Sequence, residues 1–217
     1  MNEYIDLYCE RLYPGLWSEP LNAISNVSFV IAAWAMWRLS KNHKKISPEI
    51  WVLIILTMTI GIGSFLFHAF ATKWALVTDL LPILLFQVWF IWLYNQKIIG
   101  IKTWQNGITI ALFVIAVILS GQFIEIANGS LGYAPAILVL IGLGIYHYRS
   151  KKQEPMILLT ATIVFLLSLS CRTFDQVICS FFPIGTHFLW HLFNGILLYL
   201  SARGLILNYS TIFTKGV

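Results

Sequence analysis

With 217 residues, of which 59% are hydrophobic and only 11% charged, the chain is too apolar for a soluble globular protein and is typical of an integral membrane protein. The net charge of +5 does not indicate a nucleic-acid partner, because the basic loops of membrane proteins face anionic lipid headgroups. Nothing in the composition indicates an obligate protein partner either, so we expect a multi-pass protein of the cell membrane, surrounded by the lipid bilayer.

The chain begins with a polar segment, residues 1–20, that lacks the features of a cleavable signal. Residues 1–22 have no continuous apolar core, which a signal peptide needs after its basic start. We therefore expect this segment to remain in the mature protein. Its charged side chains are Glu3, Asp6, Glu10, Arg11 and Glu19.

Seven apolar segments follow, each long enough to cross a hydrocarbon core of roughly 30 Å at about 1.5 Å per residue. They show no strand-like alternation, which indicates helices rather than a barrel. No repeat or long linker divides the chain, so residues 1–217 are predicted to form one all-α domain, a seven-transmembrane helix bundle. The segments run approximately over Leu21–Leu39, Pro48–Phe70, Trp74–Tyr94, Thr103–Gly121, Gly132–Tyr148, Pro155–Ile178 and Gly185–Leu205.

Basic residues are distributed unevenly between the two sides of the predicted bundle. Eleven of the 14 Lys and Arg residues fall on one side, namely Arg38, Lys41, Lys44, Lys45, Lys97, Lys102, Arg149, Lys151, Lys152, Arg203 and Lys215. The other side has only Arg11, Lys73 and Arg172. Because basic loops face the cytoplasm, the amino terminus is predicted to lie outside and the carboxyl terminus in the cytoplasm.

The last apolar segment begins with two histidines four residues apart, His187 and His191. On a helix they share one face, which Asn194 continues a turn later. Two imidazoles in this arrangement can bind one metal ion, although Phe188 stands where the common zinc-protease motif has its glutamate. The alternative is that two buried histidines only hydrogen-bond to neighbouring helices.

Polar residues at the same predicted depth occur in two other segments. Ser64 and His68 lie near the end of the second segment, and Asp79 lies near the beginning of the third. A carboxylate inside a membrane is costly and indicates a partner or a function. Three histidines and an aspartate at one level therefore favour a metal site near the outer side. His43 and His147 lie in or beside basic loops and are predicted to be solvated.

Several short motifs resemble those of the alkaline ceramidase family, which belongs to a wider group of seven-helix membrane hydrolases that includes the adiponectin receptors. The sequence is most similar to a bacterial-type member, and the resemblance extends over nearly the whole chain. The matching stretches are Tyr8–Glu10, Glu19–Asn26, Gly63–His68, Asp79–Pro82, Asp175–Cys179 and His187–His191.

The resemblance implies a zinc ion held by His68, His187 and His191, with Ser64 and Asp79 as catalytic residues. Three protein ligands leave one position open, which is the arrangement of a catalytic zinc. Zinc lowers the pKa of bound water and polarises an amide carbonyl. We hypothesise that Asp79 transfers the water proton to the leaving amine and that Ser64 donates a hydrogen bond to the oxyanion.

In the eukaryotic relatives, the segment around the first cysteine binds calcium. The candidate ligands in this sequence are Asp6, Glu10, Glu19 and Asn22. Leu7 and Leu12 stand where those relatives have oxygen ligands, whereas calcium requires six to eight oxygens. The alternative is that Glu10 and Glu19 pair with Arg11 or with a nearby helix end.

The three cysteines, Cys9, Cys171 and Cys179, allow one disulfide at most. The resemblance implies that Cys9 is joined to Cys179, which leaves Cys171 as a buried thiol. Arg172 and Asp175 are three residues apart on a predicted helix, and we expect them to form an ion pair.

Two classes of function remain after this reasoning. The favoured one is zinc-dependent hydrolysis of a membrane lipid amide, most directly ceramide to a sphingoid base and a fatty acid, with hydrolysis of another lipid amide or ester as an alternative within this class. The alternative is a non-enzymatic membrane receptor or assembly protein with a structural zinc. Asp79 and Ser64 favour the enzyme, because a structural zinc needs neither a general base nor an oxyanion donor.

Overall fold

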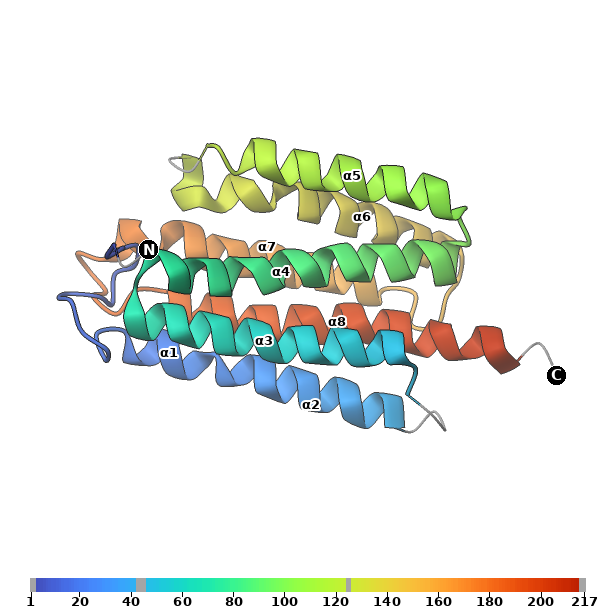
Figure 1. Ribbon diagram of the computed structural model, residues 1–217, viewed down its shortest axis with the longest axis horizontal. Helices are drawn as coiled ribbons and strands as arrows, with labels where there is room; N and C mark the ends of the chain where they lie inside the picture. The colour runs from blue at the N-terminus through green and yellow to red at the C-terminus, as the bar shows by residue number, and fades with distance from the viewer. Residues whose placement is uncertain (1–2, 42–45, 124–125, 215–217) are drawn as a thin grey trace.

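The computed structural model describes residues 3–41, 46–123 and 126–214, and within these ranges its regular structure is helical apart from one β-bridge between Tyr4 and Thr72. The helices form seven rods that run side by side along one axis (Figure 1). The prediction of an all-α, seven-helix fold is thus confirmed. The elements are α1 (Pro20–Ser25), α2 (Val27–Lys41), α3 (Pro48–Phe70), α4 (Lys73–Leu93), the π-helix η1 (Tyr94–Ile99), α5 (Thr103–Ser120), the 3₁₀ segment η2 (Ile126–Tyr133), α6 (Ala134–Arg149), α7 (Ile157–Ile178) and α8 (His187–Thr214).

The predicted segments agree closely with these helices in the middle of the chain and less well at its ends. The second segment has the same bounds as α3, whereas the first is interrupted at Asn26, between α1 and α2. The last helix begins at His187 and extends to Thr214, beyond the predicted end at Leu205. Helix α3 packs against α2 and α4, and α8 packs against α2 and α7, so α3 and α8 are central to the bundle.

Five of the described helical rods are long and apolar enough to cross a membrane: α3, α4 with η1, α5, η2 with α6, and α7. Helix α5 buries only Asn106 and Phe113, while apolar side chains such as Leu112, which is 62% exposed, point outward. Such a surface fits a hydrocarbon environment and not water. The chain is therefore a helical membrane protein.

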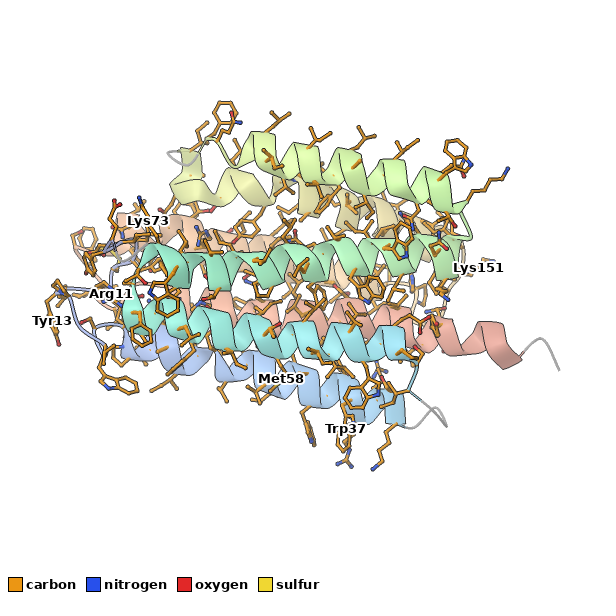
Figure 2. All side chains as sticks on the ribbon, in the orientation of Figure 1. Arg11, Tyr13, Trp37, Met58, Lys73 and Lys151 are labelled. Carbon is orange, nitrogen blue, oxygen red and sulfur yellow. A yellow bond between two sulfur atoms is a disulfide. The ribbon has the colours of Figure 1, made fainter. Side chains whose placement is uncertain are left out.

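The two ends of the bundle differ in the chain segments they contain. Arg11, Tyr13 and Lys73 lie at one end and Lys151 at the other (Figure 2), as the predicted division of basic residues requires. The first end also contains the amino-terminal segment, the α3–α4 turn and the α7–α8 connection (Figure 1). His43, Lys44, Lys45 and Lys215, which also entered the sequence predictions, lie outside the described residues.

His147 is buried, so the prediction that it is solvated is wrong. Its Nδ1 lies 2.7 Å from the hydroxyl of Tyr94, and its Nε2 lies 3.0 Å from the carbonyl oxygen of Gln153. Gln153 is held there by Asn208 of α8, whose Oδ1 accepts a hydrogen bond from the Gln153 backbone N–H at 2.9 Å. The loop after α6 thus folds back over His147, which the basic sequence around it does not reveal.

The amino-terminal segment lies along the α3–α4 turn. The backbone N–H of Ile5 donates to the carbonyl of Ala71 at 2.8 Å, and that of Lys73 donates to the carbonyl of Glu3 at 3.2 Å. A disulfide joins Cys9 to Cys179 at the end of α7, with 5.3 Å between their Cα atoms. These contacts hold the segment over the ends of α3, α4 and α7.

Candidate metal centre

Three histidines from two helices converge beneath the amino-terminal segment. His68 is in the last turn of α3, and His187 and His191 are in the first turns of α8. Their potential ligand atoms all lie within 4.8 Å of one another, and all three side chains are buried. No other group of three or more His, Cys, Asp or Glu side chains in the described ranges is arranged to hold a metal ion.

Nδ1 of His68 lies 2.5 Å from the buried carboxylate of Glu19, the residue that precedes α1. Burial opposes ionisation of Glu19, but hydrogen bonds from His68, Asn22 and Arg11 outweigh it, so the pKa of this carboxyl lies below its usual value. An ionised carboxylate accepts hydrogen bonds only, so Nδ1 of His68 carries the proton. In the neutral imidazole, which is the form that binds a metal ion, Nε2 of His68 then has a free lone pair.

Nδ1 of His191 lies 2.7 Å from the hydroxyl of Ser25 on α1. That hydroxyl has one hydrogen, which it donates to the carbonyl of Asn22 at 2.9 Å, so it accepts a hydrogen bond from His191. Nε2 of His191 then also has a free lone pair. The break between α1 and α2 lies beside this contact, and Ser28 of α2 donates to the His191 carbonyl at 2.8 Å.

His187 is fixed by its backbone and by a stacked ring. Its N–H donates to Oδ1 of Asp175 at 2.9 Å, as the neighbouring N–H of Thr186 does at 2.7 Å, so Asp175 of α7 caps the beginning of α8. The His187 ring stacks on Tyr8, with 3.6 Å between centroids. Its Nδ1 is buried and has no hydrogen-bond partner among the described residues.

These contacts leave imidazole nitrogens available to hold a metal ion between them. Nε2 of His68 and Nε2 of His191 are 3.2 Å apart, and both carry lone pairs by the assignments above. Two nitrogens bound to one tetrahedral zinc at about 2.0–2.1 Å lie roughly 3.3 Å apart, so the observed spacing fits a shared ion. The unpartnered nitrogen of His187 also fits a metal ligand. The residues present therefore suit a zinc ion with three histidine ligands.

Ser64 and Asp79 lie beside this centre. The hydroxyl of Ser64, one turn before His68, is 3.4 Å from Nε2 of His191. Helix α4 comes close to α3 because residue 63 is glycine: a Cβ there would lie 1.9 Å from the backbone oxygen of Thr78. This approach brings Asp79 into the cavity that Ser64 also lines.

The cavity runs from His191, Ser64 and Asp79 along the inside of the bundle, and its empty space, part of it open to the surroundings, is about 780 Å³. On α4 its lining extends from Asp79 to Ile91, about 18 Å at about 1.5 Å per residue. That length is somewhat more than half of a hydrocarbon core of roughly 30 Å. Its walls are mainly apolar and come from α2, α3, α4, η2, α6, α7 and α8, including Phe86, Leu143 and Phe165.

The candidate calcium ligands make contacts within the protein. Glu10 accepts hydrogen bonds from the backbone N–H groups of Leu21 and Asn22 at 2.6 and 2.8 Å, at the beginning of α1. Glu19 forms an ion pair with Arg11 and accepts a hydrogen bond from Nδ2 of Asn22 at 2.9 Å, in addition to its contact with His68. Glu19 thus pairs with Arg11 and Glu10 with a helix end, as the alternative to calcium binding predicts. Asp6 is exposed, and partial desolvation is the main cause that raises the pKa of its carboxyl.

The prediction that Arg172 and Asp175 form an ion pair is wrong. The ion pairs among the described residues do not include one between these two side chains. Asp175 accepts backbone hydrogen bonds instead, including one from Cys9 at 3.0 Å. Arg172 donates to the hydroxyl of Tyr8 at 2.8 Å and lies over the rings of Tyr133 and Trp190. The three-residue spacing of Arg172 and Asp175 on one helix could not show that both side chains bind partners from other segments.

The sequence patterns also did not predict that Ser25, Tyr8 and Asp175 orient the histidines. A signal for Ser25 exists, because Asn22, Ser25 and Asn26 form a polar stripe at helical spacing in an apolar segment. Tyr8 and Asp175 have no comparable signal beyond their place in the resemblance.

Comparison with known proteins identifies a family to which the sequence is similar. A family model described as Ceramidase matches residues 5–215, which is nearly the whole chain. None of the curated proteins compared with the sequence matches it.

Proposed function

Because the chain belongs to the ceramidase family, we propose that it is a zinc-dependent hydrolase of lipid amides, and that its substrate class is ceramide, cleaved to a sphingoid base and a fatty acid. The observation that carries the proposal is the pair of facing imidazole nitrogens, 3.2 Å apart, at a cavity that Asp79 and Ser64 line. This arrangement unites a cation site, a carboxylate and a hydroxyl with an apolar channel.

The residues of the chain have separable tasks in this proposal. His68, His187 and His191 would hold the zinc, which supplies a Lewis acid that polarises the amide carbonyl and lowers the pKa of water. Asp79 accepts a proton from the attacking water and delivers it to the leaving nitrogen. The hydroxyl of Ser64 donates a hydrogen bond to the carbonyl oxygen as negative charge develops on it.

The apolar cavity supports a substrate with a long hydrocarbon chain. A chain in the cavity would lie along the bundle, with the amide at the level of Asp79 and His191. We propose that the amino terminus lies outside and the carboxyl terminus in the cytoplasm of a cell-membrane protein, so that substrate enters from the outer leaflet. Measuring on which side of the membrane intact cells release the products would test this orientation independently of the chemistry.

A receptor or assembly protein with a structural zinc is less well supported. A structural site normally has four protein ligands, whereas this centre offers three beside a cavity. Incubation of the purified protein with labelled ceramides separates the two functions. We expect fatty-acid release that a zinc chelator abolishes and added zinc restores; no release from any lipid amide would support the receptor.

The role of Asp79 has its own test. The Asp79→Asn variant should lose turnover while it retains zinc, as elemental analysis of the purified protein would show. Glu154→Gln, at the opposite end of the bundle, is the control and should retain both. Full turnover in Asp79→Asn would refute the assigned role of Asp79.

A further inference from the structure

Asn194 is a buried polar residue that the proposed mechanism leaves unused. It lies on α8 one turn after His191, is 8% exposed and lines the cavity. Its carboxamide makes no hydrogen bond with any residue that the structure describes. A carboxamide can both donate and accept hydrogen bonds, and burial without them is unfavourable.

The other buried asparagines of the described chain all donate through Nδ2. Their acceptors are Glu19 for Asn22, the Asn22 carbonyl for Asn26, Asn106 for Asn95, the Trp92 carbonyl for Asn106 and the Gly204 carbonyl for Asn208. Asn194 is the exception, and it is also the asparagine that lines the cavity. The partner of its carboxamide is therefore to be sought in the molecule that fills the cavity.

The position of Asn194 defines which part of that molecule it meets. Three residues along α8 from His191 correspond to a rise of about 4.5 Å. If the scissile carbonyl lies at the histidines, Asn194 is level with atoms about three bonds further along the chain that enters the cavity, at about 1.5 Å per bond. A hydroxyl group at that distance could accept from Nδ2 and donate to Oδ1.

We propose that Asn194 is a specificity-determining residue that binds a hydroxyl group about three bonds from the scissile amide of the lipid. This inference rests on the proposed function for the position of the amide. The hydroxyl can belong to the acyl chain or to the long-chain amine, since the chemistry that Asn194 recognises is the same.

The test compares three lipid amides of equal chain length: one with a hydroxyl on the acyl chain near the amide, one with it on the amine chain, and one with neither. The Asn194→Leu variant, which keeps a similar volume, should lose about tenfold in kcat/KM for one hydroxylated substrate only. The substrate affected identifies the chain that carries the recognised hydroxyl. Asn194→Ala should show the same selectivity if leucine disturbs the fold.

Ser201→Ala is the matched control, because Ser201 lines the same cavity about 15 Å beyond His191 and should not discriminate between the substrates. Equal losses for all three lipids in the Asn194 variants, or no loss for any, would overturn the proposal. Equilibrium binding of the same lipids is measured in parallel. Hydroxyl-selective binding without hydrolysis would retain the role of Asn194 and reject the proposed enzyme activity.

Discussion

The carboxylate of Glu19 lies 2.5 Å from Nδ1 of His68, so the amino-terminal segment reaches the metal centre directly. A carboxylate on the second nitrogen of a metal-binding histidine fixes its tautomer and makes the free nitrogen a better ligand. The segment that the sequence presents as a polar extension is thus a structural part of the centre.

Glu19→Gln should weaken zinc binding by about 10- to 100-fold, the usual effect of removing such a partner. Competition with a chelator measures the change. Glu10→Gln is the control, because Glu10 is also buried in this segment but accepts hydrogen bonds only from the beginning of α1. An equal loss of affinity in both variants would mean that Glu19 acts through the fold of the segment alone.

Tyr8 should affect zinc binding through the orientation of His187. The ring is stacked on His187, and an aromatic pair contributes about 0.5–1.5 kcal/mol. Tyr8→Leu should therefore lower zinc affinity about two- to tenfold, whereas Tyr8→Phe, which keeps the ring and loses only the hydrogen bond from Arg172, should retain it. A loss in Tyr8→Phe as large as in Tyr8→Leu would contradict the stacking explanation.

Gly63→Ala should impair both stability and turnover. The added Cβ meets the backbone of α4 at Thr78, so α4 must move away, and overpacking of this kind costs about 1–3 kcal/mol. The movement also displaces Asp79. Gly142→Ala is the control, since a Cβ there meets nothing within 4 Å and alanine favours the helix. Thermal unfolding and ceramide turnover of the two variants are compared; equal behaviour would exclude this role for Gly63.

Reduction of the Cys9–Cys179 disulfide should destabilise the protein by about 2–5 kcal/mol, because the bond joins residues 170 positions apart. It should also lower zinc occupancy, since Tyr8 precedes Cys9 and contacts His187. Thermal unfolding with and without a reductant measures the first effect, and metal analysis the second. Cys171→Ser removes the free thiol and should leave the response to reductant unchanged.

The contacts of Arg11 predict that calcium is not needed to hold the amino-terminal segment. The Arg11 side chain is fully buried, forms an ion pair with Glu19, and donates to the carbonyls of Gly15 and His68 at 3.1 and 2.6 Å. At fixed free zinc, removal of calcium with EGTA should leave the unfolding temperature unchanged. An EGTA-induced loss of stability that calcium reverses would show that Asp6, Glu10, Glu19 and Asn22 do bind calcium.

Arg11→Ala should destabilise the protein by about 3–5 kcal/mol, because it leaves the Glu19 carboxylate buried without its cation. Lys73→Ala is the control. Its ion pair with Glu3 has side chains 53% and 67% exposed, and such a surface pair contributes at most about 1 kcal/mol. Chemical unfolding of the two variants gives the comparison.

Hydropathy and helical spacing predicted most of the helices and the three histidines, because both depend on local sequence. The bounds of α3 follow from an apolar run that begins at Pro48, and the shared face of His187 and His191 follows from four-residue spacing. The break at Asn26 was not predicted. It depends on side-chain hydrogen bonds to the carbonyls of Asn22 and Ala23 and on contacts with α8.

The amino-acid sequence by itself determined that the chain is an all-helical membrane protein with histidines, a serine and an aspartate at one depth, since periodicity and hydrophobicity are properties of neighbouring residues. Only the tertiary structure decided what surrounds those histidines. Ser25 contacts His191, which is 166 positions away in the sequence. Asp175 does not pair with Arg172 on its own helix but caps the beginning of α8. Such contacts depend on how whole helices pack, and a buried polar group takes whichever partner that packing provides.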